Sequence, residues 1–317
     1  MLKSYQLAEG QLSRITETPD LENALWIDLV VPTEAEVAQV TALGVDVPTL
    51  QDMEEIEISN RLYRTAGSDF MTAVIPGHSG SQQATSGPVT FILSAKRLVT
   101  VRHHAARPFE TYPTRAHLGA AGCAAPASIF VGLVEEIVSR QADLLENLGK
   151  SLDDVAAQVF NANTAQAPEA LQSLLKKVGR DGELLGRIRL GLMTLGRALG
   201  YFIQSRSDKD KALIKLIENE RHDMHALEVH ADALSARIGL ASDTILGLIN
   251  LSQNNTVRTL SVVAALFLPP TLIASIFGMN FHYMPVLDYH YGYYAALGGI
   301  GLSSLVTWLF FKWKKWL

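Results

Sequence analysis

The residues with the clearest chemical pattern lie between Asn254 and Ser275. Polar, small and apolar side chains recur there at alternating spacings of three and four, the heptad spacing of one helix seam. The seam comprises Asn254, Val257, Ser261, Ala264, Leu268, Thr271 and Ser275. It includes all three hydroxyl residues of the stretch 260–277. Hydroxyl oxygens accept hydrogen bonds from water around an ion or bond back to their own helix, so the seam predicts either a polar pore lining or a packing seam.

A second group of chemically capable residues lies farther upstream, where acids and histidines are interspersed. Its members are Glu218, Glu220, His222, Asp223, His225, Glu228, His230 and Asp232. Glu218, His222 and His225 share one helix face. Such a face binds a transition metal ion or is simply a charged, solvent-exposed surface, and the sequence leaves both interpretations open.

Catalytic patterns are not found. The sequence has no phosphate-binding glycine loop, no zinc-ligand spacing and no hydrolase nucleophile motif. The His103–His104 pair follows a predicted strand without a nucleophile beside it. We therefore expect no enzyme, with a membrane-anchored enzyme as a weaker alternative. A lone cysteine, Cys123, excludes an intrachain disulfide and fits a reducing compartment.

Two long apolar runs would position the seam. Residues 260–277 and 291–311 carry no charge, and each is long enough to cross a hydrocarbon core of about 30 Å. Neither run leaves a polar face for water, which favours membrane spans over buried core helices. Basic residues flank the pair at Arg258 and at 312–315, whereas the joining segment 278–290 has none. The positive-inside rule then puts both termini in the cytoplasm.

Charge divides the chain unevenly. The first 258 residues hold 31 of the 32 acids and 24 of the 27 basic residues, a net charge of −7. This balance argues against nucleic acid as a partner. The last 59 residues contain a single acid, Asp288.

The N-terminal region reads as mixed α/β structure. Short β-branched or aromatic runs predict strands at 25–31, 69–75, 89–93 and 98–102, with a helix at 33–43 and a polar loop at 77–87. From residue 128 the periodicity is helical, over 128–160, 168–204 and 208–278. A helix of about 70 residues suits a stalk entering a bilayer.

These features resemble one family. The first span of this chain, and the Gly278-Met279-Asn280 tripeptide that follows it, resemble the bacterial form of the CorA family of magnesium transporters. The tripeptide is the most specific part of the resemblance. The similarity covers the whole chain; its other segments are Trp26-Ile-Asp-Leu29, Asp52-Met-Glu-Glu-Ile-Glu57, Met284-Pro285 and Lys312-Trp-Lys-Lys-Trp-Leu317.

The resemblance implies an α+β cytoplasmic domain shaped as an α/β/α funnel, followed by a long stalk helix and two transmembrane helices, in a homopentameric channel of the bacterial inner membrane. Lipid, metal ions and copies of the chain are then its partners. The expected regions are 1–125 (mixed α/β), 126–207 (helical hairpin), 208–258 (stalk), 259–280 (first span), 281–290 (outer loop), 291–311 (second span) and 312–317 (basic tail).

The resemblance also assigns roles. Mg²⁺, with Co²⁺ and Ni²⁺ in some members, would enter through a ring of Asn280 oxygens at the Gly-Met-Asn signature and move down its electrochemical gradient. The implied pore lining is Asn254, Val257, Leu260, Ser261, Ala264, Leu268, Thr271 and Ser275. Val257, Leu260 and Leu268 would be apolar constrictions. Bound cytosolic Mg²⁺ would hold the ring closed; the candidate ligands are Glu220 and Asp223, then Asp52, Glu54 and Glu55.

The outer loop departs from the family pattern, which has Glu after Asn-Phe and after Met-Pro. This chain has His282 and Val286 there and keeps one loop acid, Asp288. Imidazole suits Zn²⁺, Co²⁺ or Ni²⁺ better than Mg²⁺, whereas Met279 favours magnesium because zinc-transporting relatives usually carry Val or Ile there. Zinc transport and a non-conducting membrane sensor therefore remain alternatives.

Overall fold

The computed structural model describes residues 1–15, 21–55, 57–78, 84–161, 167–206, 211–279, 282, 290–314 and 316. The chain divides into two compact units. The first comprises Met1–Ala157 and Lys176–Ala241, and the second comprises Gln158–Leu175 and Ser242–Leu317.

The first unit contains a seven-stranded sheet with the order β2-β1-β3-β7-β6-β5-β4. Its strands are β1 (Leu2–Ala8), β2 (Gln11–Arg14), β3 (Trp26–Val30), β4 (Leu62–Thr65), β5 (Ser68–His78), β6 (Ala84–Leu93) and β7 (Leu98–Arg102). β3 and β7 pair in parallel at the centre, and the other pairs are antiparallel. The four predicted strands are confirmed, and β1, β2 and β4 are additional.

The two ends of the polar segment 77–87 extend β5 and β6, and residues 79–83 lie outside the described residues. β5 and β6 pair as far as His78 and Ala84, so much of the expected loop belongs to a long hairpin. Gly77 and Gly87 allow this because the ring of His104 packs against them. A Cβ at either position would lie 2.6 Å from an atom of that ring.

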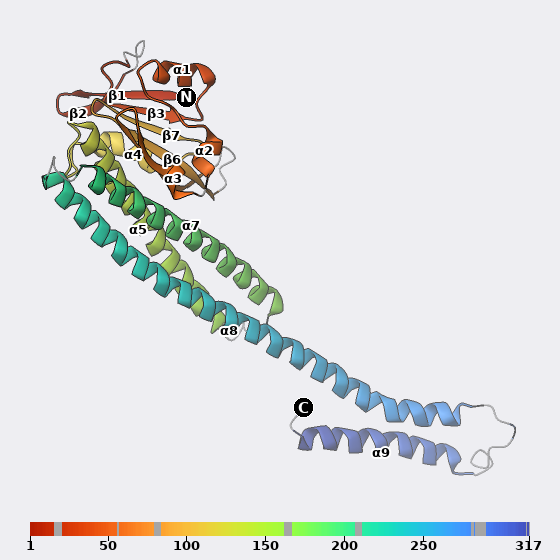
Figure 1. Cartoon of the computed structure of the whole chain (residues 1–317). Coiled ribbons are helices and arrows are strands. Elements are labelled where there is room, and N and C mark those ends of the chain that lie inside the picture. The colour runs from red at the N-terminus through yellow and green to blue at the C-terminus, as the bar shows by residue number, and fades with distance from the viewer. Residues whose placement is uncertain are drawn as a thin grey trace. The chain divides into compact units, whose positions relative to one another are not determined.

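Helices cover both faces of the sheet (Figure 1). On one face, α1 (Glu34–Thr41) and α2 (Leu50–Glu54) pack over a small core that contains Ile27 and Val99, and the short α3 (Ile58–Arg61) follows α2 in the chain. On the other, α4 (Pro108–Arg115), α5 (Pro126–Val159) and α7 (Pro168–Arg206) share the larger core. The α/β/α layering of the prediction is therefore present, and one core joins the regions predicted at 1–125 and 126–207.

The long helix α8 runs from Lys211 to Phe277, 67 residues, as the missing helix breakers predicted. Within the first unit it lies beside α5 and α7 (Figure 1). Arg237 of α8 pairs with Asp153 of α5, and Arg189 of α7 pairs with Asp232 of α8 at 2.8 Å. Its Pro269-Pro270 pair does not end the helix.

The second unit contains the apolar part of α8 and the helix α9 (Gly292–Trp313). Both are long and apolar enough to cross a membrane, with mean hydropathies of 2.1 and 1.5 over their best windows. Few of those residues are buried, 6% in α8 and 11% in α9. This exposure is opposite to that of core helices in a soluble protein, as the sequence predicted.

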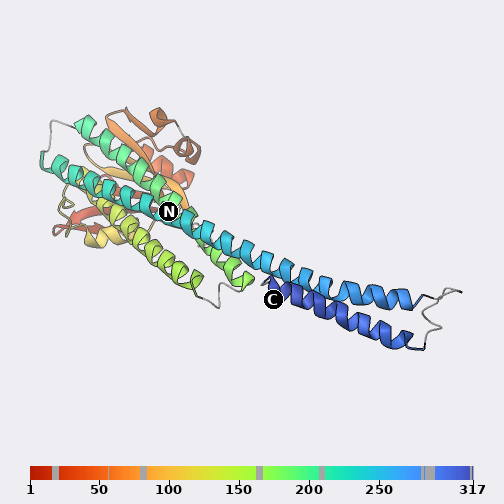
Figure 2. The same ribbon diagram turned by 90° about the horizontal axis from the view of Figure 1, so that it is seen from below.

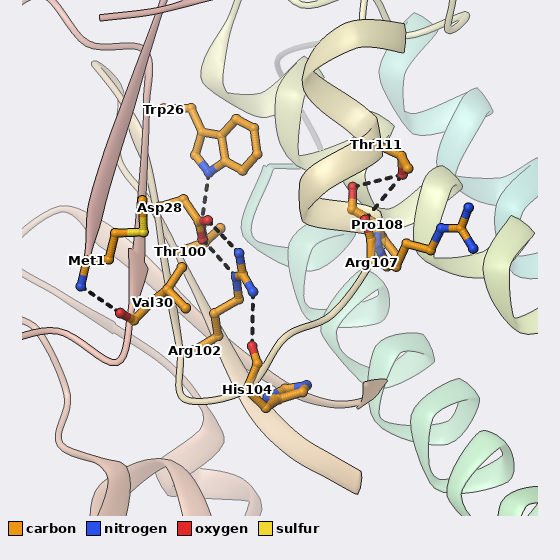
Figure 3. A network of polar contacts seen from close by, with 10 residues as sticks. All are labelled: Met1, Trp26, Asp28, Val30, Thr100, Arg102, His104, Arg107, Pro108 and Thr111. Atoms are coloured by element: carbon orange, nitrogen blue, oxygen red, sulfur yellow. Dashed lines mark hydrogen bonds and ion pairs between the residues drawn. The ribbon is translucent and has the colours of Figure 1, made fainter. Parts of the chain in front are cut away.

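A buried polar network fixes the centre of the sheet (Figure 3). Arg102 of β7 donates to both carboxylate oxygens of Asp28 of β3, at 3.2 and 2.9 Å, and both side chains are at most 1% exposed. Trp26 donates to Thr100, and Thr100 donates to Asp28. Arg102 also donates to the carbonyl of His104, which ties the loop after β7 to the network. Every charge here is satisfied within the chain.

Candidate functional site

The predicted pore lining forms one exposed surface along the C-terminal part of α8. All eight residues of the predicted lining, from Asn254 to Ser275, are exposed in the single chain. The three predicted constrictions are among the most exposed apolar side chains: Val257 is 62%, Leu260 69% and Leu268 66% exposed. We call the seven seam residues, defined by their heptad spacing from Asn254 to Ser275, the α8 seam.

A different face of α8 packs against α9. The less exposed residues on α8 include Val262, Leu266 and Ile273, and at 3.6 residues per turn they lie on the far side of the helix from the α8 seam. A Cβ at Gly299 of α9 would lie 3.9 Å from Cδ1 of Ile273. The two helices run side by side in both views (Figures 1 and 2). The α8 seam therefore faces away from α9.

Small residues allow this packing. Gly299, Ser303 and Thr307 of α9 recur every four residues and are all partly covered. Small residues at this spacing let two helices approach closely in a membrane. The hydroxyl groups of Ser303 and Thr307 donate to carbonyls of their own helix. The α8–α9 pair is thus a small-residue interface that does not use the α8 seam.

Two hydroxyl groups of the α8 seam bond to their own helix. Ser261 donates to the carbonyl of Val257 at 2.8 Å, and Thr271 donates to the carbonyl of Phe267 at 2.6 Å. This is the local bonding that the packing interpretation predicted. It also satisfies the hydroxyl hydrogen while leaving oxygen lone pairs directed outward. The α8 seam consequently presents acceptors rather than donors at these positions.

Helix α8 ends just before the Gly278-Met279 part of the signature. The amide of Gly278 donates to the carbonyls of Ala274 and Ser275, and that of Met279 donates to the carbonyl of Ile276. A Cβ at Gly278 would lie 3.2 Å from the Ala274 carbonyl oxygen. Gly278 is not among the glycines with positive φ, so close backbone approach explains the glycine better than a left-handed turn.

The outer loop is only partly described. Asn280 and Asp288 lie outside the described residues. Met279 is 45% exposed, and His282 is also exposed. His290 contacts the ring of Tyr291 edge-on, with centroids 5.1 Å apart.

The heptad line continues upstream of the predicted seam. Counting back by seven from Val257 reaches Asn250 and Asp243, and both are exposed. Asp243 makes no ion pair among the described residues of the chain. The sequence alone could have placed Asn250 and Asp243 on this line, because the seven-residue spacing continues upstream of Asn254.

Among the predicted regulatory acids, Glu220 has an unusual environment. Burial, together with the carboxylates of Glu135 and Asp223, raises the pKa of Glu220 to about 7. Glu135 comes from α5, so its approach to α8 was not visible in the sequence. Three acids gather here, but no group of three or more His, Cys, Asp or Glu residues in the described chain is arranged to hold a metal ion.

The three weaker regulatory candidates lie around α2. Asp52 accepts hydrogen bonds from the amide and hydroxyl of Thr49, which lower the pKa of its carboxyl group. This arrangement caps α2. Glu55 accepts from Asn60, whereas Glu54 is exposed and its carboxylate makes no hydrogen bond or ion pair with a described residue. Asp52 therefore has a structural role that the resemblance did not suggest.

The histidine-containing face of α8 lines a groove between α7 and α8 of about 730 Å³. Glu218, His222 and His225 all lie along it, beside Arg197 and Arg221. The described chain nevertheless does not assemble this triad as a metal site. The described residues of a single chain therefore do not form the arrangement that the transition-metal interpretation requires, and the exposed charged face is what the structure shows.

Comparison with known proteins supplies the family. A family model described as CorA-like Mg2+ transporter protein matches residues 22–314. Magnesium transport protein CorA of Escherichia coli (strain K12) is 30% identical over 323 residues, and that of Yersinia pseudotuberculosis is 29% identical over 320; each alignment covers 100% of both chains.

A solved structure has the same fold. The complete structure of the CorA magnesium transporter from Methanocaldococcus jannaschii matches with a TM-score of 0.72 and 17% identity, over 100% of this chain and 99% of that one. With a family model and relatives that match from end to end, the chain belongs to the CorA-like Mg²⁺ transporter family.

Proposed function

We propose that copies of this chain assemble into a membrane channel that carries Mg²⁺ into the cytoplasm. One observation carries the proposal: the α8 seam is exposed and faces away from α9, the other apolar helix of the chain. A polar stripe on a membrane helix avoids lipid, so it needs partners from other copies. Two spans cannot enclose a path alone, and the family resemblance makes the assembly a pentamer.

The lining suits an ion that keeps its water. Mg²⁺ releases water reluctantly, and its bound waters direct their hydrogen atoms outward. Ser261 and Thr271 donate their own hydrogen to the helix and offer lone pairs to that shell. Asn254 adds an amide oxygen. Weak contacts of this kind let a hydrated ion bind and leave again, as conduction requires.

The outer mouth would select the ion. A ring of Asn280 amide oxygens can accept hydrogen bonds from hydrated Mg²⁺ without removing its water. The C-terminus of each α8 faces this ring and carries a partial charge of about −0.5. Several helix ends together would attract a cation even though two loop acids of the family pattern are absent. Carboxylates in the ring would bind more tightly and slow release.

The membrane potential would drive the ion inward, and apolar rings along α8 would form the gate. An inward-negative potential of 100 mV contributes about 4.6 kcal/mol for a divalent ion, twice the single-charge value. Apolar rings of Val257, Leu260 and Leu268 would close the path by excluding water. Asp243, on the same line, would face the ion as it leaves the pore.

Cytosolic Mg²⁺ would regulate the gate through acids. Glu220 and Asp223 already repel each other within one chain, with Glu135 adding to the repulsion. The described residues of one chain do not complete a metal site, so we propose that a neighbouring copy supplies further ligands. Bound Mg²⁺ would offset the repulsion and hold the copies in a closed arrangement.

Zn²⁺, Co²⁺ and Ni²⁺ remain alternative cargoes because of His282 and His290. Purified chain in liposomes with a trapped Mg²⁺ indicator tests the proposal, with each of the other metals added as a competitor. Mg²⁺ uptake that depends on membrane potential supports the channel. Zn²⁺ uptake that needs a proton gradient, with no Mg²⁺ uptake, supports the alternative. No flux of any metal would support a non-conducting sensor.

A further inference from the structure

Three cations of the second unit have no counter-charge among the residues that the structure describes. Arg258 ends the polar part of α8, and Lys312 and Lys314 end α9. No acid occurs in residues 244–287 or 289–317. None of the three makes an ion pair with a described residue, and Arg258 donates only to the amide oxygen of Asn255. No described residue of the chain supplies their neutralising charge.

The three cations lie at one level. Ile273 of α8 contacts α9 at Gly299. Arg258 is about 22 Å from Ile273 along α8, and Lys312 is about 20 Å from Gly299 along the antiparallel α9, at 1.5 Å per residue. The end of α9 lies beside α8 in both views (Figures 1 and 2). Arg258, Lys312 and Lys314 therefore form one basic belt.

Aromatic side chains accompany the basic belt. The ammonium group of Lys312 lies 4.7 Å from the ring centroid of Trp308, and that of Lys314 lies 5.5 Å from that of Trp313. Trp313 is 76% exposed. Indole rings of this kind favour the level of lipid headgroups, where a lysine meets phosphate.

Exposed apolar surface continues directly from the basic belt along α9. Leu302, Leu305, Val306 and Leu309 are each at least 50% exposed. A soluble anion has nothing to place on this surface, whereas a phospholipid has acyl chains. The adjacent cations and apolar strip match the two parts of one anionic lipid.

We propose that the basic belt binds the phosphate groups of anionic phospholipids on the cytoplasmic side. The bound lipid also offsets the repulsion that a ring of such cations exerts on Mg²⁺ leaving the pore. This second statement rests on the proposed function, whereas the binding does not.

Fluorescence quenching tests the binding on the full chain. Three of its four tryptophans, 308, 313 and 316, lie at this end, and the fourth, Trp26, is fully buried in the other unit. Brominated phosphatidylglycerol and brominated phosphatidylcholine are compared as quenchers in bilayers otherwise made of phosphatidylcholine. We expect the anionic lipid to associate more tightly, by about fivefold per lysine, since a basic residue near an anionic surface contributes about 1 kcal/mol.

Matched variants assign the effect. Lys312→Gln with Lys314→Gln should reduce the preference to about that left by Arg258 and Lys315. The corresponding arginine substitutions should keep it, and Lys150→Gln in α5 should leave it unchanged. Glycerol 3-phosphate in solution should not relieve the quenching. Equal quenching by the two lipids in the unsubstituted chain would overturn the proposal, as would a preference that is undiminished after loss of Lys312 and Lys314.

Transport in the same bilayers tests the consequence. Mg²⁺ influx should rise severalfold when phosphatidylglycerol is added, and less in the glutamine variant. Influx that is equal in both lipids, with the quenching preference intact, would overturn the effect on conduction alone. No Mg²⁺ influx in any lipid would instead refute the proposed function while leaving the lipid binding standing.

Discussion

The two units of the chain treat their polar groups in opposite ways. In the first unit, the charges of Asp28 and Arg102 are buried and bonded to each other. In the second, the α8 seam and the basic belt are exposed and bonded mostly to their own helices or to no described residue. The Asp28–Arg102 pair is thus satisfied within a single chain. In the second unit, the described residues supply no charged partner for the basic belt, and the α8 seam stays exposed.

Removing one member of the buried pair should have the largest effect. Asp28→Ala leaves Arg102 charged and unpaired in the core, which costs about 3–5 kcal/mol of unfolding free energy. Thermal or denaturant unfolding of the full chain in detergent measures it. Arg237→Ala, which breaks an exposed pair, is the control and should cost about 0–1 kcal/mol. Similar losses in the two variants would contradict the contrast between the units.

The selectivity ring should respond in transport rather than in stability. Asn280→Ala removes an amide acceptor from each copy, and we expect Mg²⁺ influx to fall by about tenfold, the equivalent of one charge-assisted hydrogen bond. Unfolding temperature should not change. His282→Ala is the control and should leave Mg²⁺ influx unaltered. If Mg²⁺ influx were unchanged in Asn280→Ala, the proposed role of the Asn280 ring in transport would be contradicted.

The Glu220 cluster should give a pH-dependent effect on stability. The pKa of Glu220 is about 7 in the folded chain, above the reference value of 4.5. The folded state therefore binds a proton at Glu220 more tightly than the unfolded state does. As a result, the folded state loses stability as the pH rises from 4.5 to 7. Glu220→Gln should therefore stabilise the chain by about 1 kcal/mol at pH 8, after allowance for solvent screening, and not at pH 4. Unfolding measured at both pH values checks this. Stabilisation of equal size at pH 4 would show that repulsion is not the cause.

The end of α8 should show the smallest effect. Gly278→Ala would place a methyl group 3.2 Å from the Ala274 carbonyl oxygen, so the helix end must shift by a few tenths of an ångström. We expect Mg²⁺ influx to fall by about threefold, a cost of under 1 kcal/mol. Gly301→Ala in α9 has open space around it and should have no effect. Equal influx in the two variants would show that the close contact at Gly278 is unimportant.

The sequence predicted the long helices and the most apolar strands of the fold. The missing helix breakers predicted α8 almost to the residue, and short runs of β-branched and aromatic residues predicted β3 and β7. β1, β2 and β4 were missed because their exposed or mixed residues give a weak strand pattern. The electrostatic repulsion between Glu135 and Glu220 and the pairing of Asp28 with Arg102 were also missed. Both join residues more than 70 positions apart, and only tertiary packing brings them together.

The most direct measurement compares two adjacent positions of α8. Ser275 lies on the α8 seam. Ala274 is also exposed, but it lies neither on the α8 seam nor on the face toward α9. Each is changed to cysteine in a Cys123→Ser background, and a cationic, water-soluble thiol reagent is added outside liposomes during Mg²⁺ uptake. Our account predicts that the reagent blocks uptake through Ser275→Cys and leaves Ala274→Cys unaffected. Equal block at both positions, or block at Ala274→Cys alone, would contradict a pore lined by the α8 seam.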